Sequence, residues 1–322
     1  MTGGPAREAP ARATALASAL AGLAAGLASA GRPFDLWTPP LTPEDIRAAA
    51  DRVARGEAEV LWLDEADPDL GLLLYAPSPG ETAFFGYGCA RLAGPYLPPE
   101  DQDRREAGAR RLASLAAARA RARGDRLVTL KTGLDPAALR GLLAGGFVLA
   151  ETVTVLELDL SLDLARPAEP PPGFAWLEPG REEAAALVEA LGDFFYDGHL
   201  RHDPRPGPEA ARLIWRRAAL DDLAGAAREA VVLWDQTNRR GAGLATARLA
   251  GREAGLSILA LAGPYRGRGL GRPLLAELIR RLAGRAGRLR AETAAYNLPA
   301  LALYQALGFK PAPPLAALHL HL

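Results

Sequence analysis

The sequence predicts an α/β protein with a mixed sheet, built from two tandem halves of which the N-terminal one is degenerate. Strand and helix patterns alternate along the whole chain, which is typical of this class. One helix with a Gly-Phe end also occurs twice, because Asp135 to Gly146-Phe147 parallels Asn297 to Gly308-Phe309 at a constant offset of 162 residues. A repeated supersecondary unit is the simplest account of that offset.

The composition limits the function classes. The chain of 322 residues is long enough for two domains of about 150 residues each. Its 38 basic residues balance 38 acidic ones, so nothing indicates a nucleic-acid surface. A single cysteine, Cys89, permits no intrachain disulfide and fits a cytoplasmic setting. Four histidines and one cysteine suggest no metal site, and His319 and His321 are expected on the outward face of a last strand.

We expect an Ala/Gly-rich leader at residues 1–31, a degenerate domain at 32–165, a proline-rich linker at 166–172 and the active domain at 173–322. Ala13–Ala30 is either a weak signal-peptide core or, as we favour, a surface helix or disordered leader. No other stretch is apolar enough to span a membrane.

In the first domain the sequence predicts helices and strands in alternation. A helix is expected to begin after Thr42, and Gly124 is expected to end a long Ala/Arg helix whose arginines form a solvated face. The expected helices are Thr42–Arg55, Arg104–Arg123 and Asp135–Ala144, and the expected strands are Val60–Leu63, Leu72–Tyr75, Thr82–Leu92, Arg126–Leu130 and Thr152–Leu160. Gly86 and Gly88 are expected to mark a bulge or close packing in their strand.

In the second domain the same reasoning predicts the strand Phe174–Leu177, the helices Glu182–Leu191 and Pro208–Leu220, a hairpin of Ala230–Trp234 with Gly243–Leu249, and the strand Leu256–Ala262. A glycine-rich turn, a helix, a further strand and a last helix that ends near Gly308 complete this domain.

The glycine-rich turn carries the first chemical signal. Glycines at 267, 269 and 271 permit positive φ and let backbone N–H groups converge on an anion at the start of the next helix. Arg266, Arg268 and Arg272 add positive charge around it, so a pyrophosphate suits the turn. Alone the signal is weak, because the spacing is neither the dinucleotide fingerprint nor a Walker loop.

The second signal is the last helix. Asn297 can cap it, and Tyr304 lies two turns further along on nearly the same face. A tyrosine holds its proton at neutral pH and could donate it to a departing thiolate.

Together these residues resemble the GNAT N-acetyltransferase superfamily, through Arg266-x-x-Gly269-x-Gly271 after a strand and Asn297-x-x-Ala300-x-x-x-Tyr304-x-x-x-Gly308-Phe309. The resemblance covers roughly the last 150 residues and implies a GNAT-like fold for both halves. It implies that acetyl-CoA is the cofactor, with its arm along the backbone of Leu259, Ala260 and Leu261. The pyrophosphate would lie on Arg266, Gly267, Arg268, Gly269, Leu270, Gly271 and Arg272. Asn297 would contact the cofactor, and Tyr304 would be the general acid.

The whole chain is also loosely similar to the dTDP-fucosamine acetyltransferase group, through Phe84-Phe85-Gly86, the Gly-Phe helix end and the aromatic-Asp loop at 193–204. The resemblance implies acetylation of a nucleotide-linked amino sugar, with Tyr196, Asp197 and His199 as substrate-binding residues. Loops carry function more often than regular elements do, but a structured surface loop is an equal alternative.

We therefore expect an N-acetyltransferase in which a primary amine attacks acetyl-CoA directly. Glu292, His199, His202, Asp197 or a water is the candidate base, and a solvent-facing role for Glu292 is also open. The alternatives are acetylation of a protein or peptide amine and a non-catalytic CoA-binding module. The expected partner is a small-molecule amine, without nucleic acid or membrane, and a homodimer is left open.

Overall fold

The computed structural model describes residues 14–19, 21, 43–64, 67, 71–98, 101–161, 169–178, 186–189, 191, 200, 203, 205, 207–226 and 229–322. It divides into two compact units. Unit 1 comprises Met1–Thr152 with Pro313–Leu322, and unit 2 comprises Val153–Ala312. Among the described residues, no helix is both long and apolar enough to cross a membrane.

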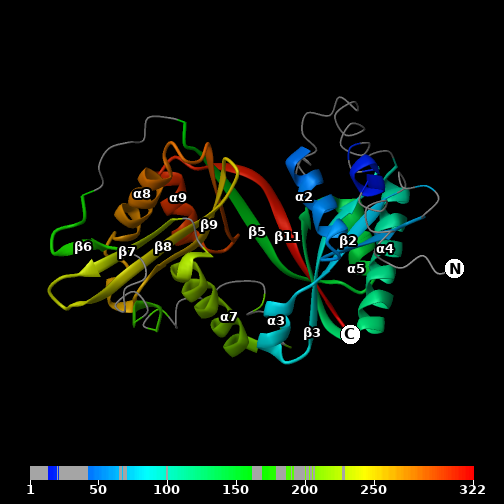
Figure 1. Cartoon of the computed structure of the whole chain (residues 1–322), viewed down its shortest axis with the longest axis horizontal. Helices are drawn as coiled ribbons and strands as arrows, with labels where there is room; N and C mark the ends of the chain where they lie inside the picture. The colour runs from blue at the N-terminus through cyan, green and yellow to red at the C-terminus, as the bar shows by residue number, and fades with distance from the viewer. Residues whose placement is uncertain are drawn as a thin grey trace. The chain divides into compact units, whose positions relative to one another are not determined.

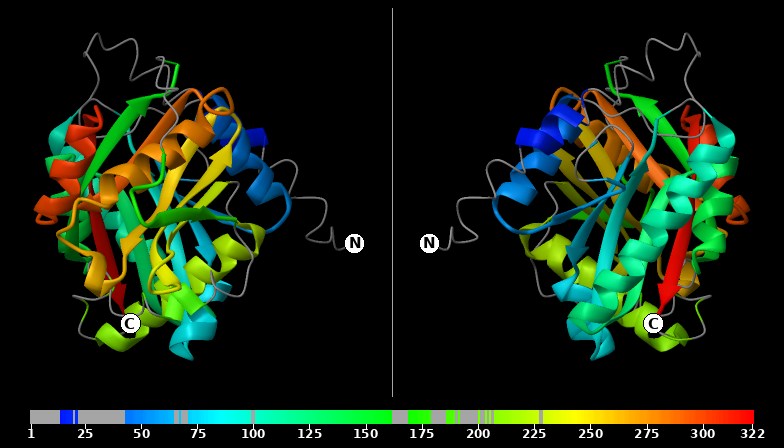
Figure 2. Two further views of the ribbon diagram at one scale, coloured as in Figure 1. Left: turned by 90° about the vertical axis from the view of Figure 1, so that its left-hand side faces the viewer. Right: turned by 90° about the vertical axis from the view of Figure 1, so that its right-hand side faces the viewer.

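Unit 1 has a mixed sheet in the order β1-β2-β3-β4-β11, with β3 and β4 parallel and the other neighbours antiparallel. The strands are β1 (Glu59–Trp62), β2 (Leu72–Pro77), β3 (Gly88–Tyr96), β4 (Asp125–Gly133) and β11 (Lys310–His321), and the helices are α2 (Pro43–Ala54), α3 (Pro79–Phe85), α4 (Gln102–Arg123) and α5 (Pro136–Ala144). The helices α4 and α5 lie side by side, as the right view of Figure 2 shows.

Unit 2 repeats this pattern with one strand more, in the order β5-β10-β9-β8-β7-β6, and here β9 and β10 are the parallel pair. The strands are β5 (Val148–Asp159), β6 (Phe174–Leu177), β7 (Glu229–Asp235), β8 (Arg240–Ala250), β9 (Glu253–Leu261) and β10 (Arg288–Ala294). The helices are α7 (Gly207–Asp221), α8 (Gly271–Leu282) and α9 (Leu298–Ala306), with the short turns η2 (Asp222–Ala226) and η3 (Gly263–Tyr265). Figure 1 shows α8 against β7 and β8.

The buried side chains of α8 form the core of unit 2. Leucine or isoleucine recurs on one face of this helix, and the side chains on that face are almost fully buried against the sheet. The members of this stripe are Leu274, Leu275, Leu278, Ile279 and Leu282, as the sequence predicts. Burying these side chains stabilises the fold by about 25 cal/mol for each Å² of apolar surface removed from water. This burial holds α8, and with it the glycine turn that precedes it, against the sheet.

The unit boundary differs from the expected linker at 166–172. The strand after α5 pairs through Val153–Asp159 with β10 of unit 2, and the strand after α9 pairs through Leu315–His321 with β4 of unit 1. Each half of the sequence therefore gives its last strand to the other unit. The unit boundaries lie within β5, between Thr152 and Val153, and within β11, between Ala312 and Pro313. The proline-rich connector follows β5 and lies inside unit 2.

One expected strand needs correction. Thr82–Leu92 is not one strand, because α3 extends to Phe85 and Gly86 ends it in the left-handed conformation at φ 70°. Pro79 in the first turn favours this helix over the strand that the aromatic residues suggest. Gly88 does pack closely, since a Cβ there would lie 2.6 Å from an Asp125 carboxylate oxygen.

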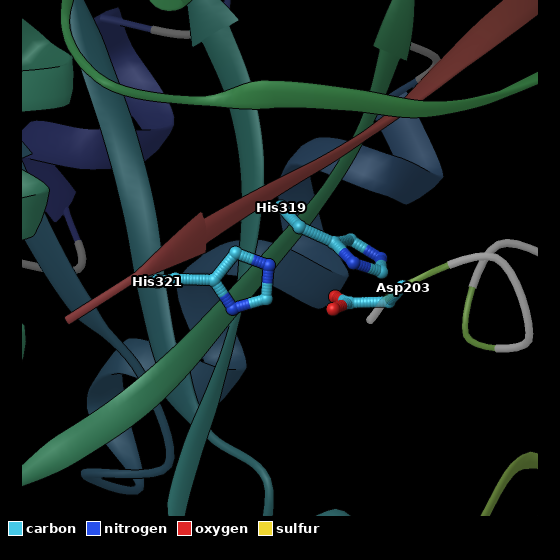
Figure 3. A group of neighbouring side chains, drawn as sticks. All are labelled: Asp203, His319 and His321. Atoms are coloured by element: carbon cyan, nitrogen blue, oxygen red, sulfur yellow. The ribbon is translucent and has the colours of Figure 1, made fainter. Parts of the chain in front are cut away.

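His319 and His321 do lie on the last strand, and Figure 3 shows both rings on β11. Their ring centroids are 6.0 Å apart. However, His319 is buried rather than outward-facing. Arg105 is likewise buried and pairs with Asp135, so it is an exception to the solvated arginine face of α4. Most of the leader, residues 182–185 and 190 of the expected helix 182–191, and the loop residues Tyr196, Asp197, His199 and His202 lie outside the described residues.

Candidate active site

The candidate site of unit 2 is a cleft that opens where β9 and β10 separate. The two parallel strands are paired only from Glu253–Arg288 to Gly255–Arg290. Beyond that point both strands continue, and a cleft of about 620 Å³ lies along them. The lining residues are Trp215, Leu256, Ser257, Ile258, Leu259, Ala260, Leu261, Arg266, Gly271, Glu292, Thr293, Asn297, Pro299, Ala300, Leu303 and Tyr304.

The edge of β9 that faces the cleft offers backbone hydrogen-bonding groups. On its other edge β9 pairs with β8, from Gly243–Leu261 to Ala250–Glu253. A register shift between Thr246 and Ala247 leaves Ser257 as an extra residue, which makes a β-bulge inside the cleft. Because the backbone groups of a strand alternate between its two edges, about half of those in Leu256–Leu261 point towards the cleft. An extended amide chain could therefore pair with them.

The glycine turn borders the cleft through Arg266 and Gly271. Gly267 and Gly269 adopt φ of 69° and 76°, and no atom lies within 4 Å of a Cβ built on either. These glycines are therefore needed for the left-handed backbone rather than for space. The helix α8 that follows has no side-chain cap at its N-terminus. Pro273 has no N–H, and the Arg272 N–H donates to the Gly269 carbonyl over 3.4 Å, so the Gly271 N–H is the first-turn group that, with the positive end of the helix dipole, can face an anion.

Of the three arginines at the turn, Arg266 lines the cleft. Arg268 lies over the ring of Tyr265 at 5.7 Å, and that ring is itself buried. The hydroxyl of Tyr265 donates to Asp235 over 2.9 Å and accepts from Arg240 over 2.7 Å. The aromatic residue before the turn thus anchors it to the hairpin of β7 and β8.

Tyr304 lines the cleft from α9 and is 5% exposed. Its ring packs against Phe309 at a centroid distance of 5.3 Å. Burial raises the pKa of the Tyr304 phenol to about 12, because the charged phenolate would be poorly solvated there. The phenol therefore keeps its proton at neutral pH.

Asn297 caps α9, as the sequence predicts. Its side-chain oxygen accepts from the Ala300 backbone N–H over 3.4 Å, and its amide donates to the Thr293 hydroxyl over 2.9 Å. The end of this helix also follows prediction, since Gly308 is left-handed at φ 87°. Asn297 lines the cleft, but both ends of its amide are already engaged within the fold.

Glu292 lies on the rim of the cleft and is exposed. Its carboxylate pairs with Arg290 two residues earlier, over 3.2 Å, on the same face of β10. The structure thus places this candidate base beside the cleft, near the point where β9 and β10 separate.

Several lining residues were not predicted as site residues from the sequence, among them Trp215 and Thr293. Trp215 lies on α7, an amphipathic helix in which a large aromatic residue could have indicated a ligand wall. Thr293 precedes Asn297 by four residues in β10, and its polar side chain in a largely buried strand could have drawn attention. The three loop residues Tyr196, Asp197 and His199 are outside the described part of the chain.

Comparisons with known proteins agree with this geometry. Residues 185–309 match the family model described as Acetyltransferase (GNAT) family. A search of curated proteins found no match. The family match covers the cleft, the glycine turn and α9, so the C-terminal half of the chain is a GNAT-type acetyltransferase domain.

Solved structures resemble most of the chain. One is a tandem GNAT protein from the clavulanic acid biosynthesis pathway, with 18% identity, a TM-score of 0.54 and coverage of 78% of this chain and 79% of that one. A second is a GCN5-related N-acetyltransferase from Sphaerobacter thermophilus, with 16% identity, a TM-score of 0.57 and coverage of 84% and 85%. A third is a glucosamine N-acetyltransferase region of a fungal multi-domain β-N-acetylglucosaminidase, with 15% identity, a TM-score of 0.59 and coverage of 93% and 36%. These similarities confirm the α/β fold of two tandem halves.

Proposed function

Because residues 185–309 form an acetyltransferase domain of the GNAT family, we propose that this chain transfers an acetyl group from acetyl-CoA to a primary amine by direct attack. One observation carries the proposal. The cleft between β9 and β10 is lined by Arg266 and Gly271 of the glycine turn and has a buried, protonated Tyr304 in its wall. A ligand with a pyrophosphate, an extended amide arm and a thioester matches these features in that order.

The chain contributes four groups to the reaction. The glycine turn holds the pyrophosphate through backbone N–H groups and positive charge. The open edge of β9 pairs with the amide arm, and one of its N–H groups donates a hydrogen bond to the developing oxyanion. As the amine nitrogen bonds to the carbonyl carbon and the C–S bond breaks, Tyr304 gives its proton to sulfur. The amine loses a proton to a base at the rim.

Glu292 is the proposed base. Glu292→Gln should lower kcat by about 100-fold, in the range that general-base catalysis supplies, and leave the affinity for CoA unchanged. Glu157→Gln is the matched control. Glu157 lies on the neighbouring strand β5, outside the cleft, and pairs with Arg288 of β10 over 3.0 Å. Equal kcat in both variants would assign the proton to a water or to the loop at 193–204.

The proposed acceptor is an amino sugar linked to a nucleotide. Trp215 supports it, since an indole in the cleft offers a flat apolar face to a sugar ring. A protein or peptide amine is the second candidate. A panel of dTDP-amino sugars and amine-bearing peptides, assayed for acetyl transfer, separates the two. Transfer to neither, with intact CoA binding, would favour a non-catalytic CoA-binding module.

The decisive experiment is calorimetric titration of acetyl-CoA into the wild type, Gly269→Glu and Gly284→Glu. A glutamate at 269 should abolish binding, because its side chain blocks and repels the pyrophosphate. Gly284 is the control, since its φ is 77° and a Cβ there also has no neighbour within 4 Å, but it does not line the cleft. Equal binding by Gly269→Glu and the wild type, or no binding by the wild type, would overturn the proposed function.

A further inference from the structure

A short chain of hydrogen bonds in the wall of the cleft sets the direction of one hydroxyl group. The Ala300 N–H donates to Oδ1 of Asn297, and Nδ2 of Asn297 donates to Oγ1 of Thr293. The cap on α9 requires an acceptor, so the oxygen of the Asn297 amide must face the helix. The NH₂ group must then face Thr293.

The consequence concerns the proton of Thr293. A threonine hydroxyl has one O–H donor and two acceptor lone pairs. Because Asn297 occupies a lone pair as donor, the Thr293 hydrogen has to point elsewhere. Thr293 is half-buried and lines the cleft, and within the part of the chain that the structure describes it has no second hydrogen-bond partner. Its proton is therefore available to a ligand in the cleft.

The position of Thr293 indicates which part of such a ligand its hydroxyl would contact. Asn297 precedes Tyr304 by seven residues, which corresponds to roughly 10 Å along the axis of α9. Thr293 is bonded to Asn297 and so lies at the end of the helix remote from Tyr304. If Tyr304 marks the sulfur atom, Thr293 faces the arm rather than the reacting carbonyl group.

We propose that the Thr293 hydroxyl donates a hydrogen bond to an amide carbonyl oxygen of the arm of CoA, and that Asn297 acts on the cofactor through Thr293. The proposal rests on the proposed use of acetyl-CoA. It makes Thr293 a binding residue and Asn297 a positioning residue.

The test is calorimetric titration of CoA into the full-length wild type, Thr293→Val, Thr293→Ser, Asn297→Asp and the double variant Thr293→Val/Asn297→Asp. Thr293→Val keeps the shape and should raise Kd about five- to tenfold, the value of one hydrogen bond. Thr293→Ser should restore binding. Asn297→Asp keeps the cap, as Asp135 does on α5, but turns the Thr293 proton towards its own carboxylate. The double variant should bind no more weakly than Asn297→Asp alone, which reports the coupling.

Acetyl transfer gives a second readout. Thr293→Val should raise KM for acetyl-CoA by a factor similar to that for Kd and leave kcat within twofold. Unchanged Kd in Thr293→Val, with binding by the wild type, would overturn this inference and leave the proposed function intact. A lower kcat at unchanged KM would also overturn it, because the hydroxyl would then act on the reacting carbonyl. Failure of the wild type to bind CoA would overturn both.

Discussion

The helix pair α4 and α5 of unit 1 corresponds in the sequence repeat to α8 and α9 of unit 2, but the two pairs are packed differently. In unit 1, α5 packs directly on α4, and a Cβ at Gly141 would lie 2.7 Å from Ala109 Cβ and still closer to the Glu106 carbonyl. At the offset of 162 residues the counterpart in unit 2 is Leu303, which lines the cleft. Between α8 and α9, both of which are fully described, the approach is through a side chain, since Leu303 Cδ2 would lie 3.2 Å from a Cβ built on Gly271.

The helix starts differ in the same sense. Asp101 caps α4 with its own carboxylate, and Asp103 adds a second acid in the first turn. Arg105 from that turn pairs with Asp135, the cap of α5. The positive end of α4 is thus satisfied by the protein's own carboxylates, whereas α8 begins without a side-chain cap beside three arginines. We therefore expect an anion to bind at the start of α8 and not at the start of α4.

The largest effect is expected from Gly141→Leu, which copies Leu303 into unit 1. The leucine would overlap the α4 backbone and should destabilise the protein by about 3 kcal/mol, the upper range for overpacking. Leu303→Ala, the reverse change, removes a half-buried side chain and should lower the free energy of unfolding by only about 1 kcal/mol. Urea unfolding of both variants checks the comparison. Similar losses would show that the helix pairs are not packed differently.

The next effect concerns chemistry rather than packing. Tyr304→Phe should lower kcat by about 100-fold with little change in CoA affinity, since only the proton donor is lost. Tyr296→Phe is the matched control, because Tyr296 is 51% exposed. At the offset of 162, unit 1 has the buried Leu142 in place of Tyr304, so no such donor exists there. Steady-state turnover in Tyr304→Phe equal to that of the wild type would remove Tyr304 from the mechanism.

The smallest effect involves a buried Tyr–Asp pair that both units have. Tyr75 donates to Asp125 over 2.5 Å, and Tyr265 donates to Asp235 over 2.9 Å. Hydrogen bonds from Asn238, with a smaller contribution from Tyr265, lower the pKa of Asp235 to about 2.

Asn238→Ala should therefore raise the pKa of Asp235 and destabilise unit 2 at neutral pH. A carboxyl with a lowered folded-state pKa stabilises the fold above its unfolded pKa, near 3.9, and this contribution is lost as the pH falls towards 2. The difference in unfolding free energy between the wild type and the variant should thus be constant above about pH 4 and shrink below it. A difference that persists unchanged at pH 3 would contradict the role of ionised Asp235.

Local sequence patterns predicted the backbone of the glycine turn and of the last helix, both of which border the candidate site. They did not predict which strands pair across the sequence. Specific residue types indicate these two backbone conformations. Gly267 and Gly269 permit the positive φ of the turn, and Asn297 and Gly308 mark the start and the end of the last helix. Thr82–Leu92 failed because a helix start and a left-handed glycine compete there with aromatic strand residues. Trp215 joins the cleft through contacts of high sequence separation, and the hydrogen bond of Thr293 depends on which way an amide faces. The exchange of β5 and β11 depends on pairings that no local pattern encodes.

The exchange of β5 and β11 between the two units limits how the chain can be divided into fragments. A fragment of residues 173–322 would contain the whole cleft and both sequence motifs, and would look complete in an alignment. It would nevertheless lack β5, so β10 would present a bare edge from Arg288 to Ala294, and β11 would have no β4 to pair with. Exposed strand edges of this kind recruit other chains. Neither half of the sequence can therefore be separated from the other without losing a partner strand of its sheet.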